Sequence, residues 1–339
     1  MVRKFNDSKI SIIINKTPDK NWNSFVSKSE FGTYFQTVEY AKARKKFFGH
    51  IPMFLRFHSS SGKIIGQLLL FQTRFALERF KKYFGFSKIS SIYKNLAFPI
   101  NNLNWSYGPL IFDMNYKNDV MQSFANFLKS EKYNFKGYSH PLDGLVFPSQ
   151  LGYSTKNNST FVINLKDDLE TIFNNTNKNS VRKNIKRAEV RGVKIRLIES
   201  KSDALKHFNL LKEHRIRNNL IYPSKEIVLE NYRLGKNKGL TGFLALFEEK
   251  PIASITFVYL NGYILEEGIS RSVIDIRKKL YAQELLRWNI IKWGKKNDCK
   301  FYDLAGVKAE NRTTKENGIF RNKEKWGGKL IHYLSYSSK

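Results

Sequence analysis

The chain carries two copies of one pattern: a pair of adjacent strands, then an amphipathic helix, then a further strand. The strand pairs are expected at residues 51–58 with 62–71 and at residues 242–248 with 249–258. Each pair joins across a short lysine-containing turn and continues into an apolar run, which is typical of a β-hairpin. Helices are expected at residues 120–132 and 279–297, followed by strands at 133–141 and 299–306. The repeated order predicts two related domains of the mixed α/β class.

The expected domain boundary lies in the polar segment 152–160, which we interpret as a turn-rich linker, because residues 161–165 then begin a new apolar strand. We therefore expect a first domain over residues 1–154 and a second over residues 155–321. The length of 339 residues and the hydrophobic content of 41% suffice for two hydrophobic cores.

The charge balance points to anionic partners. The chain has 59 Lys and Arg against 29 Asp and Glu, a formal net charge of +30. Such a charge attracts polyanions, and the candidates are tRNA, a nucleotide-linked precursor and an anionic membrane surface. A lysine-rich composition of no functional meaning is the alternative interpretation.

The remaining composition restricts the compartment and the chemistry. The single cysteine, Cys299, cannot form an internal disulfide and suits a reducing cytoplasm. The six histidines form no ligand pattern, so we expect no metal site. No apolar run approaches the roughly 18 residues needed to span a bilayer, and the run at 10–14 is too short for a signal peptide. We expect a cytoplasmic monomer, with peripheral contact to the inner face of the membrane as a further option.

A basic helix is expected at residues 179–192. Val181, Ile185 and Ala188 recur at the spacing of one buried helix face, and Gly192 stands where a helix ends. Residues 178–196 contain eight basic residues and one acid, so the ion pairs that usually lace a solvated helix are missing. The segment is either a solvated surface or a site for phosphates, with Arg182 as a candidate contact.

The most specific motif lies in the last quarter of the chain. Residues 302–307 read YDLAGV, and residues 318–328 read GIFRNKEKWGG. We interpret this as a strand that ends at Asp303, a flexible basic loop, and a glycine-framed aromatic turn that presents Lys323. The order resembles the C-terminal signature of the FemAB-type aminoacyltransferases, with Ala305 in place of a glycine and Asn322 in place of an aromatic residue.

Other segments resemble the same family in the same order along most of the chain. Residues 35–44 are similar to its Q-x-x-x-W-x-x-x-K segment, with Tyr40 for Trp and Arg44 for Lys. Residues 182–193 match R-x-N-I-x-x-A-x-x-x-G-V, and residues 105–110 resemble its Gly-Pro turn. The resemblance implies that Arg44, and either Arg215 or Arg217, contact the phosphates of the acceptor.

The resemblance to this family implies both a fold and a reaction, and we expect the following of this chain. The fold is two tandem domains of the GNAT-like acyl-CoA N-acyltransferase type, with the tail 322–339 returning to the first. The reaction is transfer of an amino acid from aminoacyl-tRNA to an amino group of a UDP-linked or lipid-linked peptidoglycan precursor peptide or a similar acceptor, without a further cofactor. Lys323 would supply positive charge to the reaction's oxyanion or to the tRNA 3′ end, and Tyr302 and Phe320 would line the substrate site.

The proton acceptor of this reaction is left open between Asp303 and Glu267, and removal of the proton by the substrate itself needs neither. The sequence offers no Ser/His/Asp or Cys/His set, so we expect direct transfer without a covalent intermediate.

Two other functions compete. An acetyl-CoA-dependent N-acetyltransferase of the same fold would bind pyrophosphate with an R/Q-x-x-G-x-G/A loop at a helix N-terminus. Residues 277–282 keep Arg277 and Ala282 but place Leu280 at the glycine, where a side chain would obstruct the ligand. A non-enzymatic RNA-binding protein fits the charge, but no RRM-like or KH-like motif is present.

Overall fold

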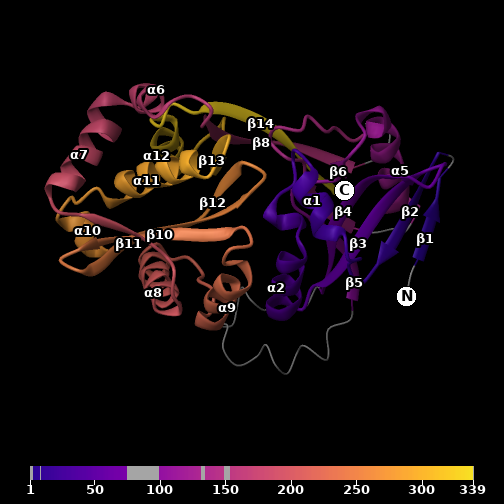
Figure 1. The fold of residues 1–339 in the computed structure, drawn as a ribbon, viewed down its shortest axis with the longest axis horizontal. Helices are drawn as coiled ribbons and strands as arrows, with labels where there is room; N and C mark the ends of the chain where they lie inside the picture. Colours follow the sequence, from indigo (N-terminus) through magenta and orange to yellow (C-terminus); the bar gives the residue numbers. More distant parts are fainter. Residues whose placement is uncertain (1–2, 8, 75–98, 131–133, 149–152, 339) are drawn as a thin grey trace. The chain divides into compact units, whose positions relative to one another are not determined.

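The computed structural model describes residues 3–7, 9–74, 99–130, 134–148 and 153–338, drawn in colour in Figure 1. The chain divides into two compact units. Unit 1 comprises Met1–Asn158 and His332–Lys339, and unit 2 comprises Ser159–Ile331. Each unit contains a mixed sheet covered by helices, so the predicted tandem α/β fold is confirmed.

The sheet of unit 1 is built mainly from antiparallel neighbours, with β5 and β7 parallel. The end of β14 (Lys329–Ser338) pairs antiparallel with β7. A two-residue strand, β6 (Leu110–Ile111), pairs with β4. The expected hairpin is confirmed as β3 and β4. The strands follow the order β1 (Arg3–Asn6), β2 (Ile10–Asn15), β3 (Ile51–Ser59), β4 (Ile64–Arg74), β5 (Pro99–Trp105) and β7 (Asn134–Tyr138).

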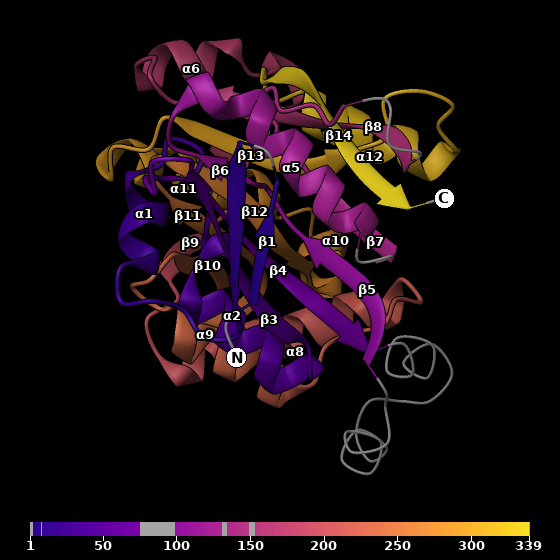
Figure 2. The same cartoon turned by 90° about the vertical axis from the view of Figure 1, so that its right-hand side faces the viewer.

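Alternation along β3 gives the sheet of unit 1 two buried faces. Leu55 and Phe57 belong to the core that α5 (Lys117–Ser130) closes, and Phe57 meets Phe124 of that helix. Figure 2 shows α5 lying against the sheet. Phe54 points the other way and packs edge-on against Trp22. That second face carries the helices α1 (Trp22–Lys28), η1 (Tyr34–Gln36) and α2 (Val38–Phe48). A short turn of helix, η2 (Met114–Tyr116), leads into α5.

The sheet of unit 2 is antiparallel except between β12 and β13, which run parallel. The second expected hairpin is confirmed as β10 and β11. The prediction of a turn-rich linker at 152–160 is wrong from residue 153 onward, because the strand β8 already begins there. The polar side chains at the start of β8 are mostly exposed, so they do not prevent the backbone from pairing as a strand. The strands follow the order β8 (Tyr153–Asn164), β13 (Phe301–Val307), β12 (Tyr263–Arg271), β11 (Lys250–Leu260), β10 (Leu240–Phe247) and β9 (Lys194–Leu197).

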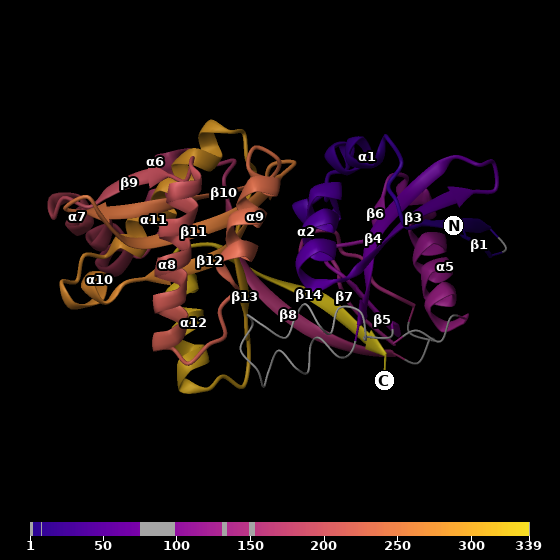
Figure 3. The ribbon, with the colours of Figure 1, turned by 90° about the horizontal axis from the view of Figure 1, so that it is seen from below.

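Helices cover both faces of this second sheet, as Figures 1 and 3 show. Phe243 and Ala245 of β10 join the core under α11 (Ala282–Lys296), while Leu244 and Leu246 join the core under α8 (Lys201–Arg217). The side of α11 also carries α6 (Leu169–Asn175) and α7 (Lys183–Val190), and α9 (Lys225–Gly235) packs beside α8. A short helix, α10 (Val273–Arg277), precedes α11.

The predicted basic helix is confirmed as a π-helical turn, η4 (Lys178–Arg182), followed by α7. Its start is capped by Asn177, whose side chain accepts from the backbone N–H groups of residues 179 and 180. Val181, Ile185 and Ala188 are buried, as the spacing predicted.

The segment before Lys323 differs from the prediction. Residues expected to form a loop and an aromatic turn form the helix α12 (Thr314–Glu324). Thr313 and Glu316 make a capping box at its start, in which each side chain bonds the other's backbone N–H. That T-x-x-E spacing was present in the sequence and outweighs the helix-weakening Gly318.

Candidate active site

Lys323 lies in the last turn of α12 with 8% of its surface exposed. Its ammonium donates to the carbonyl oxygens of Ala305 at 2.9 Å and Gly306 at 3.0 Å. Burial lowers the pKa of Lys323 to about 8, and two nearby carboxylates partly oppose this shift. The side chain is therefore a partly desolvated cation that is held by two fixed acceptors.

A bulge in β13 directs these two carbonyl groups. The pairing of β13 with β8 shifts register between Asp303 and Gly306. Ala305 has a φ of 63°, in the left-handed region that favours glycine, and its N–H donates to Asp303 Oδ1 at 2.7 Å. The glycine that the resemblance expects at this position thus has a conformational reason.

Asp303 is fully buried at the base of the bulge. Its carboxylate accepts hydrogen bonds from the hydroxyl groups of Thr160 and Tyr263, in addition to the N–H of Ala305. Burial raises the pKa of Asp303 to about 6, and the hydrogen bonds act in the opposite direction. Three partners within unit 2 make this carboxylate an anchor for the bulge.

A second buried network surrounds Arg287 of α11. Its guanidinium meets the carboxylate of Glu266 through Nε–Oε2 and Nη2–Oε1 contacts of 2.9 Å each. Tyr302 donates to the same carboxylate at 2.6 Å, and Arg287 Nη1 donates to Asn322 Oδ1 at 2.8 Å. Burial opposes the charge of Glu266, yet Arg287 and Tyr302 hold the pKa of this carboxyl below its ordinary value. Asn322, the residue beside Lys323, is thereby fixed to the helix α11.

Glu266 and Arg287 were not among the residues predicted from the sequence, where the adjacent Glu267 was a candidate instead. Glu267 is exposed, because the pairing of β12 with β11 shifts register at this point and turns the side chain outward. The sequence carried one signal for this pair: Arg287 stands among the mostly apolar residues 285–291. An arginine buried in such a segment needs an acidic partner. Thr160 and Tyr263, the partners of Asp303, carried no such signal.

The two aromatic candidates lie in different surroundings. Tyr302 is fully buried within the Arg287 network. Phe320 is half-buried on α12, one turn before Lys323, with its ring 5.0 Å from that of Phe161. The guanidinium of Arg312 lies 3.9 Å above the Phe320 ring. Lys323, Asp303, Tyr302 and Phe320 thus occupy one region of unit 2.

Arg44 belongs to unit 1 and is half-buried on α2. Its guanidinium lies 4.5 Å from the ring centroid of Phe48, and its Nε is buried without a hydrogen-bond partner among the described residues. Tyr40, which replaces the family's tryptophan, packs edge-on against Phe35 and Phe71. Aromatic rings therefore surround the cation of Arg44, and its Nε donor is left without an acceptor in the part of the chain that the structure describes.

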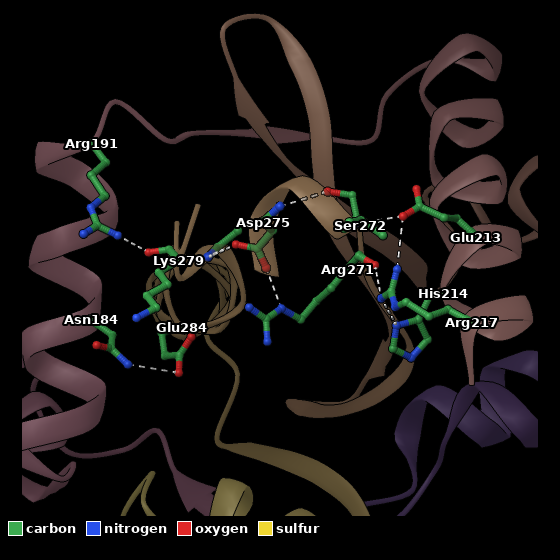
Figure 4. A network of polar contacts seen from close by, with 12 residues as sticks. Asn184, Arg191, Glu213, His214, Arg217, Arg271, Ser272, Asp275, Lys279 and Glu284 are labelled. Atoms are coloured by element: carbon green, nitrogen blue, oxygen red, sulfur yellow. Dashed lines mark hydrogen bonds and ion pairs between the residues drawn. The ribbon is translucent and has the colours of Figure 1, made fainter. Parts of the chain in front are cut away.

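The other arginine candidates differ in their partners. Arg182 donates to Asn174 Oδ1 at 3.2 Å, while its buried Nε has no partner in the described part of the chain. Arg217 is engaged, since it pairs with Glu213 at 3.1 Å and donates to the carbonyl oxygen of Arg271 at 2.6 Å (Figure 4). Arg215 is half-buried, and its side chain makes no hydrogen bond or ion pair with the residues that the structure describes. Arg215 is therefore the more available cation at the end of α8.

The N-terminus of α11 is filled by carboxylates of the chain itself, as Figure 4 shows. Asp275 is fully buried; its Oδ1 accepts from the N–H of Ala282 at 3.1 Å, and its Oδ2 pairs with Arg271. Glu284, in the first turn, pairs with Lys325 at 2.8 Å. The sequence suggested that the side chain of Leu280 would obstruct a ligand. In the structure this side chain is instead buried in the core. A pyrophosphate would have to displace Asp275 to use this helix end.

The described residues contain neither a cluster of metal-binding side chains nor a helix that could cross a membrane. No group of three or more His, Cys, Asp or Glu side chains is arranged to hold a metal ion. No helix combines the length and the apolar character that a membrane-crossing segment requires.

Comparisons with known proteins identify the fold. No protein-family profile and no curated protein matches the sequence. The structure is similar to that of FemX, with 12% identity, a TM-score of 0.70, and coverage of 95% of this chain and 96% of that one. It is also similar to L-PGS from Bacillus licheniformis, with 14% identity, a TM-score of 0.59, and coverage of 95% of this chain and 92% of that one. A tandem GNAT protein from the clavulanic acid biosynthesis pathway matches with 9% identity, a TM-score of 0.52, and coverage of 97% of this chain and 98% of that one. The tandem GNAT-like fold that the FemAB resemblance implied is thus confirmed.

Proposed function

We propose that this chain is an aminoacyltransferase that moves an amino acid from an aminoacyl-tRNA to an amino group of a peptidoglycan precursor peptide or a similar acceptor. The support comes from three sources: sequence motifs in the family's order, the likeness of the fold to FemX, and the buried ammonium of Lys323. We place the reaction in the cytoplasm, with aminoacyl-tRNA as the donor and no further cofactor.

The observation that carries the choice of donor is the occupied N-terminus of α11. Asp275 accepts there from the N–H of Ala282, a group that an acyltransferase of this fold would offer to the pyrophosphate of acetyl-CoA. A buried carboxylate at that position repels a second anion. The fold therefore keeps its acyl-transfer framework while its pyrophosphate site is closed, which favours an ester donor without CoA.

The reaction needs a positive group at the reacting carbonyl. The acceptor's amine nitrogen attacks the ester carbon, the bond from this carbon to the tRNA ribose oxygen breaks, and the amine proton ends on the released ribose hydroxyl. Negative charge develops on the carbonyl oxygen in between. The ammonium of Lys323 uses two of its three N–H groups on Ala305 and Gly306, so the third remains for that oxygen.

We assign the neighbouring groups as positioning residues. Asp303 anchors the bulge whose carbonyl oxygens hold the ammonium of Lys323. Arg287 holds Asn322 and thereby the last turn of α12. Direct proton transfer by Asp303 is disfavoured, since three hydrogen bonds from unit 2 already engage its carboxylate. Asp303→Asn should therefore keep a larger share of activity than loss of the Lys323 charge.

We assign phosphate binding to arginines that have hydrogen-bond donors without an acceptor among the described residues. Arg44 and Arg182 each have a buried Nε without a hydrogen-bond partner among the described residues. Arg215 is the further candidate, whereas Arg217 is already paired with Glu213. Tyr302 and Phe320 are proposed to shape the region around Lys323.

A label-transfer assay tests the proposal. The protein is mixed with a UDP-linked precursor peptide and either labelled aminoacyl-tRNA or labelled acetyl-CoA. Lys323→Met is compared with Lys315→Met, which removes an exposed charge from the same helix. We expect transfer from tRNA only, a loss of at least about 100-fold in Lys323→Met, and wild-type rates in Lys315→Met. Transfer from acetyl-CoA alone would establish the N-acetyltransferase alternative. Transfer from neither donor would leave the RNA-binding alternative.

A further inference from the structure

Three aliphatic side chains are exposed together at the end of α8. Ile216, Leu220 and Ile221 have exposed fractions of 53%, 40% and 58%. Single exposed apolar residues are ordinary on a protein surface, but a local cluster of large aliphatic groups marks a contact surface. We call residues 212–225 the α8 turn.

The α8 turn is a fixed structure. The N–H of Leu220 donates to the carbonyl oxygen of Arg215 at 2.8 Å, and that of Asn219 donates to Ile216 at 3.0 Å. Asn219 has a φ of 53°. This is the Schellman arrangement that ends many helices, in which the residue after the left-handed position usually covers the last turn. Here that residue, Leu220, remains exposed instead.

Side-chain contacts also connect this end of α8 to the end of β12 and to the start of α10. The Glu213 carboxylate accepts from the N–H of Val273 at 2.8 Å, and Arg217 donates to the carbonyl oxygen of Arg271 at 2.6 Å (Figure 4). The aliphatic groups are consequently presented by a rigid support, so little conformational entropy is lost when they bind.

Cations flank the aliphatic cluster. The α8 turn contains the basic residues Lys212, Arg215, Arg217 and Lys225 and a single acid, Glu213. The acid is neutralised by its ion pair with Arg217. Tyr222 of the same segment is half-buried, and Lys212 Nζ lies 5.7 Å from its ring centroid. Lys212, Arg215 and Lys225 have no ion-pair partner among the described residues. Aliphatic groups, a tyrosine and such cations in one segment match the layers of an anionic membrane surface, from acyl chains to phosphates.

We propose that the α8 turn docks the protein on anionic lipid surfaces, with Ile216, Leu220 and Ile221 entering the boundary between headgroups and acyl chains. The basic face of α7 provides the contrast, since Lys183, Lys186 and Arg187 are exposed there around only one exposed aliphatic residue, Val190. RNA phosphates can use such a face, whereas three clustered aliphatic groups gain nothing from phosphates alone. This inference goes beyond the proposed function and holds for either acyl donor.

Sedimentation with lipid vesicles tests the inference. The full chain is mixed with vesicles of phosphatidylglycerol and phosphatidylcholine, or of phosphatidylcholine alone. We expect binding to the anionic vesicles that weakens with salt. The triple variant Ile216→Ser, Leu220→Ser, Ile221→Ser should lower the partition coefficient at least about tenfold. Val190→Ser, which changes an aliphatic residue that is 88% exposed, should bind like the wild type. Circular dichroism verifies that both variants are folded.

A site-specific probe separates insertion from loose attraction by charge. Ile221→Cys and Val190→Cys are each labelled with an environment-sensitive dye, since the native Cys299 is buried. Blue-shifted emission on anionic vesicles is expected for position 221 and not for position 190. Equal partition of the triple variant and the wild type, or no shift at position 221, would refute membrane docking.

A further assay separates this inference from the proposed function. The triple variant should retain wild-type transfer to the soluble UDP-linked acceptor. If it instead keeps vesicle binding and loses that transfer, the α8 turn is a substrate surface and the inference is wrong. Failure of the wild type to transfer any label, with vesicle binding intact, would overturn only the aminoacyltransferase proposal.

Discussion

The guanidinium of Arg287 and the carboxylate of Glu266 form a two-point ion pair whose side chains are 4% and 1% exposed. The pair joins α11 to β12, and the remaining Nη1 of Arg287 reaches Asn322 on α12. Arg287 thus connects α11, β12 and α12 of unit 2 at a buried position next to Lys323. A buried pair need not add stability relative to apolar residues, but it restricts how these elements can pack.

Removing one partner of this pair should destabilise the folded protein. Glu266→Gln leaves the Arg287 cation buried without its counter-charge, so we expect the free energy of unfolding to fall by about 3 kcal/mol. Glu249→Gln is the control, because Glu249 and its partner Lys194 are 77% and 74% exposed, and that change should stay within about 0.5 kcal/mol of the wild type. Urea unfolding measures both. Equal values for the two variants would mean that water or another group compensates Arg287.

Lys323 should make stability depend on alkaline pH. Burial lowers its pKa in the folded state to about 8, from 10.5 for an ordinary lysine. Between these values the unfolded chain binds more protons than the folded protein, so the free energy of unfolding rises with pH. Relative to Lys323→Met, the wild type should gain about 1 kcal/mol per pH unit from pH 8 to 10. Urea unfolding of both proteins at pH 7, 8, 9 and 10 measures this difference, and a difference independent of pH would show that Lys323 titrates normally.

Ala305→Gly should stabilise the protein. Ala305 has a φ of 63°, where a Cβ is unfavourable, and glycine relieves that strain at some cost in the entropy of the unfolded chain. The expected net gain is about 0.5–1 kcal/mol, seen as a higher Tm. Ala253→Gly is the control, since Ala253 is a buried strand residue without a positive φ, and it should lower Tm. A lower Tm for Ala305→Gly would contradict the left-handed conformation at that position.

Much of the fold was readable because local patterns sufficed. The two hairpins and the basic helix follow from period-two and helical spacing, and Gly192, with a φ of 78°, stands just beyond the end of that helix as predicted. The linker at 152–160 was predicted wrongly because polar composition suggests a turn, whereas β8 is held by backbone pairing that composition does not report.

The candidate site was only partly readable for a different reason. Lys323 and Asp303 stand in a recognisable motif, so sequence alone could select them. The groups around them come from distant elements: Thr160 of β8 and Tyr263 of β12 bond Asp303, and Arg287 of α11 holds Asn322 beside Lys323. The choice between Glu266 and Glu267 depends on a strand bulge, and one residue of register moves a side chain to the other face of the sheet.

The two glycines that frame the Lys323 segment should respond in opposite ways to alanine. Gly318 lies inside α12, and a Cβ there would meet nothing within 4 Å, so Gly318→Ala should stabilise the helix by about 0.5–1 kcal/mol. Gly327 has a φ of 73°, and a Cβ would lie 2.4 Å from the backbone oxygen of Asn175 at the end of α6. Because backbone cannot yield cheaply, Gly327→Ala should cost at least about 2 kcal/mol. Thermal unfolding of the two variants measures both signs, and Gly318→Ala serves as the matched control. A neutral Gly327→Ala would mean that α6 does not pack closely against the end of α12, and the placement of Lys323 would then need another support.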